Sequence, residues 1–96
     1  MPAIETEQRE KHQHSDYDGR YAAIIFNNDA NSFDEVIDVI MLATSCPFEE
    51  ARIETWDAHT YGKAPVHFAD EAECIRVATT ISNIGVKTEV RKEWGD

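Results

Sequence analysis

The sequence predicts an α+β domain in which a small antiparallel sheet packs against helices, with the element order β-α-α-β-α-β. Three features of the 96 residues predict this fold class. A short apolar run precedes a segment rich in turn-forming residues, three stretches combine helical spacing with end signals, and a final stretch alternates apolar and polar residues. A chain of this length has room for one domain.

The first strand and the first helix are predicted from neighbouring segments. Residues 21–26 form a short apolar run with β-branched and aromatic side chains, which is typical of a buried strand. Residues 32–35 (Ser-Phe-Asp-Glu) match a capping box, in which serine and glutamate each bond the other's backbone N–H. The helix that follows should end near residues 44–45. Its predicted apolar face consists of Phe33, Val36, Ile37, Ile40 and Met41.

The second helix is predicted to begin at Pro47, because a fixed φ suits the first helical position, and to end at Gly62. Residues 63–68 are predicted to form a strand, which Pro65 restricts to a sheet edge or a bulge. The residues expected on one side of the helix are Phe48, Ala51, Thr55, Ala58 and His59.

The third helix is predicted from a cap at residues 70–73, and it should stop before Gly85. Residues 86–91 alternate apolar and polar side chains, which indicates a half-exposed strand. The residues expected to face inward from the helix are Ala72, Ile75, Ala78, Thr79 and either Ile81 or Ser82.

The N-terminal segment, residues 1–20, differs from the rest of the chain in composition. Ile4 and Tyr17 are its only sizeable apolar side chains. So little apolar surface cannot offset the entropy that ordering costs, so we expect a flexible polar tail. The folded core domain is expected to comprise residues 21–96.

The charge balance narrows the possible partners. Nine Lys and Arg against nineteen Asp and Glu give a net charge of −10. This charge disfavours nonspecific binding to nucleic acid and to acidic membrane surfaces, both of which need cations. No apolar run is long enough for a membrane-spanning helix, and no secretory signal is recognisable. Cys46 and Cys74 are too few for a disulfide framework, so we expect reduced thiols in a cytoplasmic protein.

Two features carry candidate chemistry, and each also has a structural explanation. His59 could present a polar group at the mouth of a pocket, or it could bond a backbone carbonyl at the core edge. Asn27, Asn28 and Asp29 could offer acceptors to a cationic ligand, or they could satisfy a turn. No phosphate-binding loop, zinc-ligand spacing or nucleophile motif occurs. We therefore expect no catalytic residue, no metal and no cofactor.

The strand, the Asn-rich turn and the His-bearing helix together resemble ClpS, the adaptor family of the ATP-dependent Clp protease. Residues 21–40 match the family's first strand, its Asn-Asp-Asp turn and the helix that follows. Glu50-Ala51 and residues 58–64 match a second helix that ends with a histidine and a glycine. The separation between Asn27 and His59 equals that of the family without a gap. The resemblance covers residues 21–96 and is stronger over residues 21–64.

The resemblance implies a non-enzymatic adaptor of the bacterial cytosol or the plastid stroma. Such an adaptor binds N-degrons, which are proteins with an exposed first residue Leu, Phe, Trp or Tyr, and delivers them to the Clp AAA+ unfoldase for degradation. Asn27 and neutral His59 would accept hydrogen bonds from the free α-amino group. The implied N-degron site consists of Asn27, Asn28, Asp29, Asn31, Phe33, Thr55, Ala58, His59 and Thr88.

The sequence departs from the family pattern at several of these positions. Asn28 stands where the family has Asp, and Phe33 stands where it has a gating Met. Thr55 and Ala58 replace larger apolar residues, so the pocket is either wider or filled by Phe33. A second function therefore stays open. In it, the chain is a divergent ClpS-like interaction domain, a regulator or an acidic mimic, that docks on a basic partner without recognising N-degrons.

Overall fold

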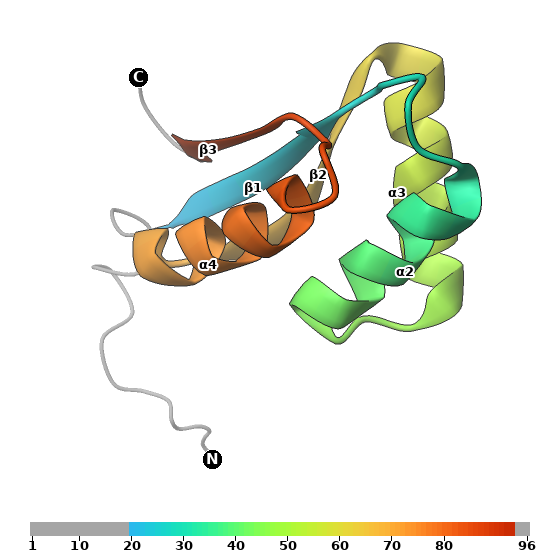
Figure 1. Cartoon of the computed structure of the whole chain (residues 1–96). Coiled ribbons are helices and arrows are strands. Elements are labelled where there is room, and N and C mark those ends of the chain that lie inside the picture. Colours follow the sequence, from blue (N-terminus) through green and yellow to red (C-terminus); the bar gives the residue numbers. More distant parts are fainter. Residues whose placement is uncertain (1–19, 94–96) are drawn as a thin grey trace.

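A computed structural model of the chain describes residues 20–93, and the predicted element order is confirmed (Figure 1). The elements are β1 (Tyr21–Phe26), α2 (Phe33–Thr44), α3 (Phe48–Tyr61), β2 (Lys63–Ala69), α4 (Glu71–Ser82) and β3 (Thr88–Lys92). None of these three helices combines the length and the apolar character that a membrane crossing requires. The predicted tail, residues 1–20, lies outside the described residues apart from Arg20.

The sheet has three antiparallel strands in the order β2-β1-β3, so the most apolar strand lies in the middle. α4 runs along one face of the sheet, and none of the described helices covers the opposite face (Figure 1). Alternation along β1 divides its side chains between the two faces. Ala23 and Ile25 belong to the core beneath the helices, whereas Ala22 and Ile24 point to the open face.

A β-bulge interrupts the edge strand β2. Ala23 pairs with His67 and Ile24 pairs with Pro65, so Val66 is the extra residue. This confirms the predicted edge or bulge position of Pro65, which has no N–H to donate to a ladder. The bulge also shifts the alternation of β2. Phe68 consequently lies on the open face, opposite Ala22, and its side chain is exposed.

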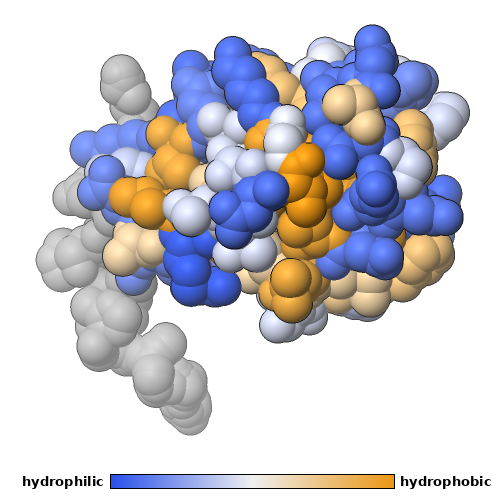
Figure 2. Space-filling view, in the orientation of Figure 1, coloured by the Kyte–Doolittle hydropathy of each residue, from blue (hydrophilic) through white to orange (hydrophobic). Residues whose placement is uncertain are grey.

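The capping box of α2 is confirmed. The Ser32 hydroxyl accepts from the Glu35 N–H at 3.1 Å, and the Glu35 carboxylate accepts from the Ser32 N–H at 2.9 Å. α2 packs against both α3 and α4, so its buried face is broader than predicted. That face consists of Val36, Ile37, Val39, Ile40 and Ala43, while Phe33 at the first turn is 38% exposed. Figure 2 shows hydrophobic side chains gathered in a band where α2 and α4 meet.

The start and the inner face of α3 differ slightly from the prediction. Pro47 is the N-cap, with extended backbone, and the helix begins one residue later. Gly62 ends the helix as predicted, and its φ of 93° lies in the left-handed region that glycine adopts without strain. Of the expected face, only the small residues Ala51, Thr55 and Ala58 are buried.

The predicted inner face of α4 is confirmed for Ala78 and Ile81 and wrong for Ala72, Ile75 and Thr79. The buried residues are Cys74, Val77, Ala78 and Ile81, whereas Ile75 is 48% exposed. The error arises because Cys74, which is fully buried, acts as a small apolar side chain and sets the phase of the helix. The same burial raises the pKa of its thiol. β3 begins at Thr88, later than predicted, because the preceding loop already inserts Val86 into the core.

Two asparagines join the turn after β1 to the loop after α4. The Asn28 amide group donates to Asn31 Oδ1 at 3.0 Å and to the Gly85 carbonyl at 3.3 Å. Its oxygen accepts from the Asn31 N–H at 3.2 Å, and Asn31 in turn donates to the Ile84 carbonyl at 3.0 Å. The structural explanation of this segment therefore applies to Asn28. Its side chain links the turn after β1 to the loop after α4 by hydrogen bonds.

Asn28→Asp should lower the free energy of unfolding by about 1–2 kcal/mol, because a carboxylate cannot donate and would face two oxygen acceptors. Urea unfolding monitored by circular dichroism measures this change. Asn27→Asp is the matched control, since the Asn27 side chain makes no hydrogen bond within residues 20–93. If Asn28→Asp were as stable as the unmodified chain, the proposed role of Asn28 in linking the two loops would be contradicted.

Glu54 of α3 is a partly buried carboxylate in an acidic neighbourhood. One of its oxygens is buried without a hydrogen-bond partner within the described residues. Burial, followed by the adjacent carboxylates of Glu50 and Asp57, raises the pKa of Glu54 to about 8. The folded protein therefore holds a proton on Glu54 that the unfolded chain releases near its ordinary value of 4.5. Stability falls as the pH rises through this window.

Glu54→Gln should remove that pH dependence. At pH 8 the variant is expected to be more stable than the unmodified chain by about 1–2 kcal/mol, a value reduced for the partial exposure of the group. The difference should vanish below about pH 4, because the folded and the unfolded chain then both carry the proton. Urea unfolding across this pH range tests it, with the exposed Glu71→Gln as control. A constant difference at all pH values would refute the assignment.

Candidate functional site

A pocket lies where the end of β1, the start of α2 and the last turns of α3 meet. The structure brings seven of the nine predicted site residues together there: Asn27, Asn28, Asn31, Phe33, Thr55, Ala58 and His59. Three further lining residues, Ile25, Phe26 and Val36, were not predicted. They complete the apolar wall of the pocket. The one feature of the sequence that could have predicted them is that they lie on the same strand and helix as the predicted site residues.

The other two predicted residues do not line this pocket. Asp29 is exposed in the turn after β1. Thr88 pairs with Ile25 on β3, and its hydroxyl donates to the Ala78 carbonyl of α4 at 3.4 Å. Thr88 thus contributes to the packing of α4 on the sheet, because its side chain faces that helix.

Backbone hydrogen bonds place Asn27 beside the end of α3. The Asn27 N–H donates to the Gly62 carbonyl at 3.0 Å, and the Gly62 N–H donates to the Ala58 carbonyl at 2.9 Å. The end of β1 is therefore fixed to the helix cap that follows His59. Both the Asn27 and the His59 side chains are exposed at the pocket, and within residues 20–93 neither makes a hydrogen bond. Their acceptor atoms remain available to a ligand.

Three aromatic rings cluster over the pocket. The Phe33 ring centroid lies 5.3 Å from that of His59 and 6.0 Å from that of Trp56, both in edge-to-face arrangements. Trp56 and His59 are 5.7 Å apart. Trp56 was not predicted to belong to the site. Its spacing of three residues from His59, which places the two on one helix face, is the signal that could have found it.

The pocket is narrow. Its free volume is about 30 Å³, enough for about one water molecule. A cavity that holds benzene is roughly five times larger, at about 150 Å³. The small side chains of Thr55 and Ala58 therefore do not leave a wide pocket. Phe33 also lines it, with its ring packed edge-on against His59.

The polar groups of the pocket are neutral amides and one imidazole. None of the lining residues, all within the described part of the chain, carries a carboxylate. The Asn28 oxygen already accepts from the Asn31 N–H, so Asn27 and His59 are the better acceptors for a cationic group. The arrangement can bind a positively charged donor by hydrogen bonds, without a full ion pair.

One group of side chains in residues 20–93 has metal-ligand geometry, and it lies outside the pocket. Cys46, Glu50 and Glu54 each bring one ligand atom to within 4.8 Å of the others. Exposed acidic groups commonly lie this close without an ion. Glu50 and Glu54 lie four residues apart on α3, and residues at this spacing are neighbours on one helix face. The spacing explains their proximity without a metal.

Comparison with known proteins identifies the family. The family model described as "ATP-dependent Clp protease adaptor protein ClpS" matches residues 16–89. A solved structure of Agrobacterium tumefaciens ClpS2 bound to L-phenylalaninamide aligns with 76% of this chain and 98% of that chain, with a TM-score of 0.68 and 18% identity, and so shares the fold. No curated protein sequence matches. Because the family match spans most of the chain, the protein belongs to the ClpS family of adaptors of the ATP-dependent Clp protease.

Proposed function

We propose that this adaptor binds N-degrons with a bulky hydrophobic first residue and delivers them to a Clp AAA+ unfoldase. The observation that carries the proposal is the placement of two free acceptors, on Asn27 and His59, beside one apolar pocket. A degron has the matching pair of features, an α-ammonium group next to a hydrophobic side chain. The ligand of the related ClpS2, L-phenylalaninamide, has the same pair.

The α-amino group is the feature that the acceptors would recognise. An ammonium group has three donors, and the Asn27 oxygen and a neutral His59 nitrogen can each take one. Acetylation removes the charge and two of the donors. Recognition of this kind separates a true N-terminus from the same side chain inside a protein.

The degron side chain would enter by displacing Phe33. The Phe33 ring is partly exposed, and each of its two aromatic contacts contributes about 0.5–1.5 kcal/mol. Burial of a Leu or Phe side chain contributes about 1.5–3 kcal/mol. The two quantities are of similar size, so the gain from burial is largely offset by the opening of the pocket. We therefore expect binding no tighter than micromolar.

The narrow pocket favours a second candidate function. In this alternative Phe33 occupies the degron position permanently, and the acidic domain docks on a basic partner without reading an N-terminus. The absence of a carboxylate among the lining residues also favours this alternative, because no lining side chain can form an ion pair with an α-ammonium group. The two functions differ in whether a free N-terminus matters.

Fluorescence anisotropy with labelled peptides that start with Leu, Phe, Trp, Tyr, Ile or Met tests the proposal. Free bulky hydrophobic N-termini should bind, and their Nα-acetylated forms should not. His59→Ala should weaken binding about tenfold, because one charge-assisted hydrogen bond is lost. His67→Ala is the matched control, since His67 lies outside the pocket and contacts Glu73. Unchanged binding by His59→Ala would exclude its assigned role, and no binding across the panel would favour the second function.

Phe33→Ala should enlarge the pocket and tighten the binding of Phe- and Trp-initiated peptides several-fold, because no ring then has to be displaced. The same anisotropy assay measures this. Phe48→Ala is the control, since Phe48 is likewise the first residue of a helix and is 53% exposed, but lies outside the pocket. Weaker binding by Phe33→Ala would mean that the ring contacts the ligand and does not block it.

A further inference from the structure

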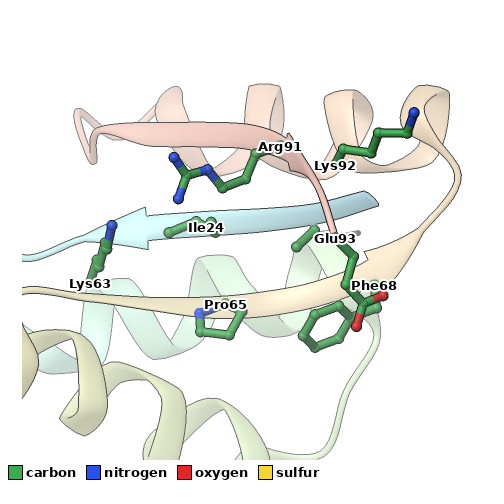
Figure 3. A pocket seen from close by; sticks show the side chains of 8 residues that line it. Ile24, Lys63, Pro65, Phe68, Arg91, Lys92 and Glu93 are labelled. Carbon is green, nitrogen blue, oxygen red and sulfur yellow. The ribbon is translucent and has the colours of Figure 1, made fainter. Parts of the chain in front are cut away.

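The open face of the sheet carries a groove of about 650 Å³ (Figure 3). Its floor is apolar and consists of Ala22, Ile24, Pro65 and Phe68. Charged side chains, among them Lys63 and Arg91, rise around this floor (Figure 3). The groove shares no lining residue with the candidate degron pocket, and the two surfaces adjoin at Phe26, which lines that pocket and contacts Lys63 and Lys87.

Positive charge is concentrated on this face of an acidic protein. Residues 20–93 contain seven Lys and Arg against thirteen Asp and Glu. Five of those seven cations surround the groove or its ends: Arg20, Lys63, Lys87, Arg91 and Lys92. Only two of the thirteen acids, Glu89 and Glu93, lie on the same face. The face therefore has a net charge of +3, whereas the other described residues sum to −9.

Aromatic rings contact three of these cations, at the two ends of the groove. At one end the Lys87 and Lys63 amino groups lie 4.7 Å and 5.8 Å from the Phe26 ring centroid. At the other end the Arg20 guanidinium lies 5.4 Å from the Phe68 ring centroid. Within residues 20–93 neither lysine has an ion-pair partner. Their charges are therefore positioned but not neutralised.

The spacing of the two ends fits an extended chain. Phe68 lies opposite Ala22, and Phe26 follows four residues later on β1, which corresponds to about 13 Å of strand. An extended segment of four or five residues spans this distance. An apolar floor between two cationic ends matches a segment with acidic residues on either side of one hydrophobic side chain.

We infer that the open face of the sheet docks an extended acidic segment of a partner protein that carries one aliphatic or aromatic side chain. The acidic side chains contact Lys63 and Lys87 at one end. At the other end they compete for Arg20 and Arg91 with Glu93 and Glu89, which lie 3.1 Å and 3.6 Å from the two guanidinium groups. The hydrophobic side chain covers Ile24 and Pro65. A nucleic acid fits less well, because the surrounding charge of the protein repels a long polyanion.

Isothermal titration calorimetry with the full chain tests the inference. The probe is the N-acetylated peptide Asp-Glu-Phe-Asp-Glu amide, whose blocked N-terminus excludes recognition of a free α-amino group. It should bind in 50 mM NaCl and more weakly in 300 mM NaCl, as expected for exposed charges. The same peptide with Ala in place of Phe should bind at least threefold more weakly, and a Lys-Lys-Phe-Lys-Lys peptide should not bind.

Charge reversal locates the site. The double variant Lys63→Glu/Lys87→Glu should weaken binding at least tenfold, and Lys63→Gln/Lys87→Gln provides a milder change should the first fail to fold by circular dichroism. Arg52→Glu is the control, because it changes the net charge by as much as one of the two lysine reversals but lies on α3. Its affinity for the acidic peptide should be within twofold of that of the unmodified chain. His59→Ala should also bind unchanged, which separates this surface from the proposed degron pocket.

Three results would overturn the inference. The first is unchanged binding by the lysine double variants, and the second is equal binding of the acidic and lysine peptides. The third is a different occupant. A dimer in sedimentation equilibrium that the double variant abolishes would assign the face to a second copy of this chain. Binding of oligothymidylate, lost in the same variant, would assign it to nucleic acid.

Discussion

The hydrogen bonding of β1 on both of its edges is the constraint on which the rest of the structure depends. Its alternate side chains point to two different surfaces, and pairing with β2 and β3 on either side extends both of these surfaces. Ala23 and Ile25 hold the helices to one face, while Ala22 and Ile24 form the floor of the groove on the other. Its last hydrogen bond, from the strand end to the Gly62 carbonyl, brings α3 and its histidine to the pocket. One short strand thus contributes to both candidate binding surfaces, which adjoin at Phe26.

The candidate degron pocket is organised unequally for the two parts of its proposed ligand. The polar part of the pocket is preformed. The exposed side chains of Asn27 and His59 lie at the end of a strand and of a helix, and the backbone ends of these two elements are hydrogen-bonded to each other. The apolar part is closed by Phe33, which packs edge-on against two neighbouring rings. A ligand therefore meets its acceptors before it finds room for its side chain. Selectivity then depends on whether the side chain gains more by burial than the ring cluster loses by opening.

Local signals in the sequence predicted the elements well, because caps, a proline and two glycines mark their ends. Contacts between distant segments were harder to predict. The Asn28 amide donates to the carbonyl of Gly85, which is 57 residues away in the sequence, and no local pattern predicts this hydrogen bond. Thr88 was assigned to the site through the family resemblance, and its actual place depends on the register of β3 against β1, which no local pattern encodes. The phase of α4 was missed for a chemical reason, since a buried cysteine counts as an apolar residue. The seven site residues that did converge come from two segments at the family's spacing, Asn27–Phe33 and Thr55–His59.

The bulge in β2 has a consequence for how the sheet meets other chains. An edge strand with free backbone groups invites a foreign strand to pair with it, and such pairing is how sheets grow into aggregates. Here one edge contains Pro65, which offers no donor, and a distorted ladder at Val66. The other edge is only five residues long and ends in Arg91 and Lys92. Neither edge presents a flat, regular template. A sheet that resists extension in this way is less prone to pair with foreign strands and so to join aggregates of other chains.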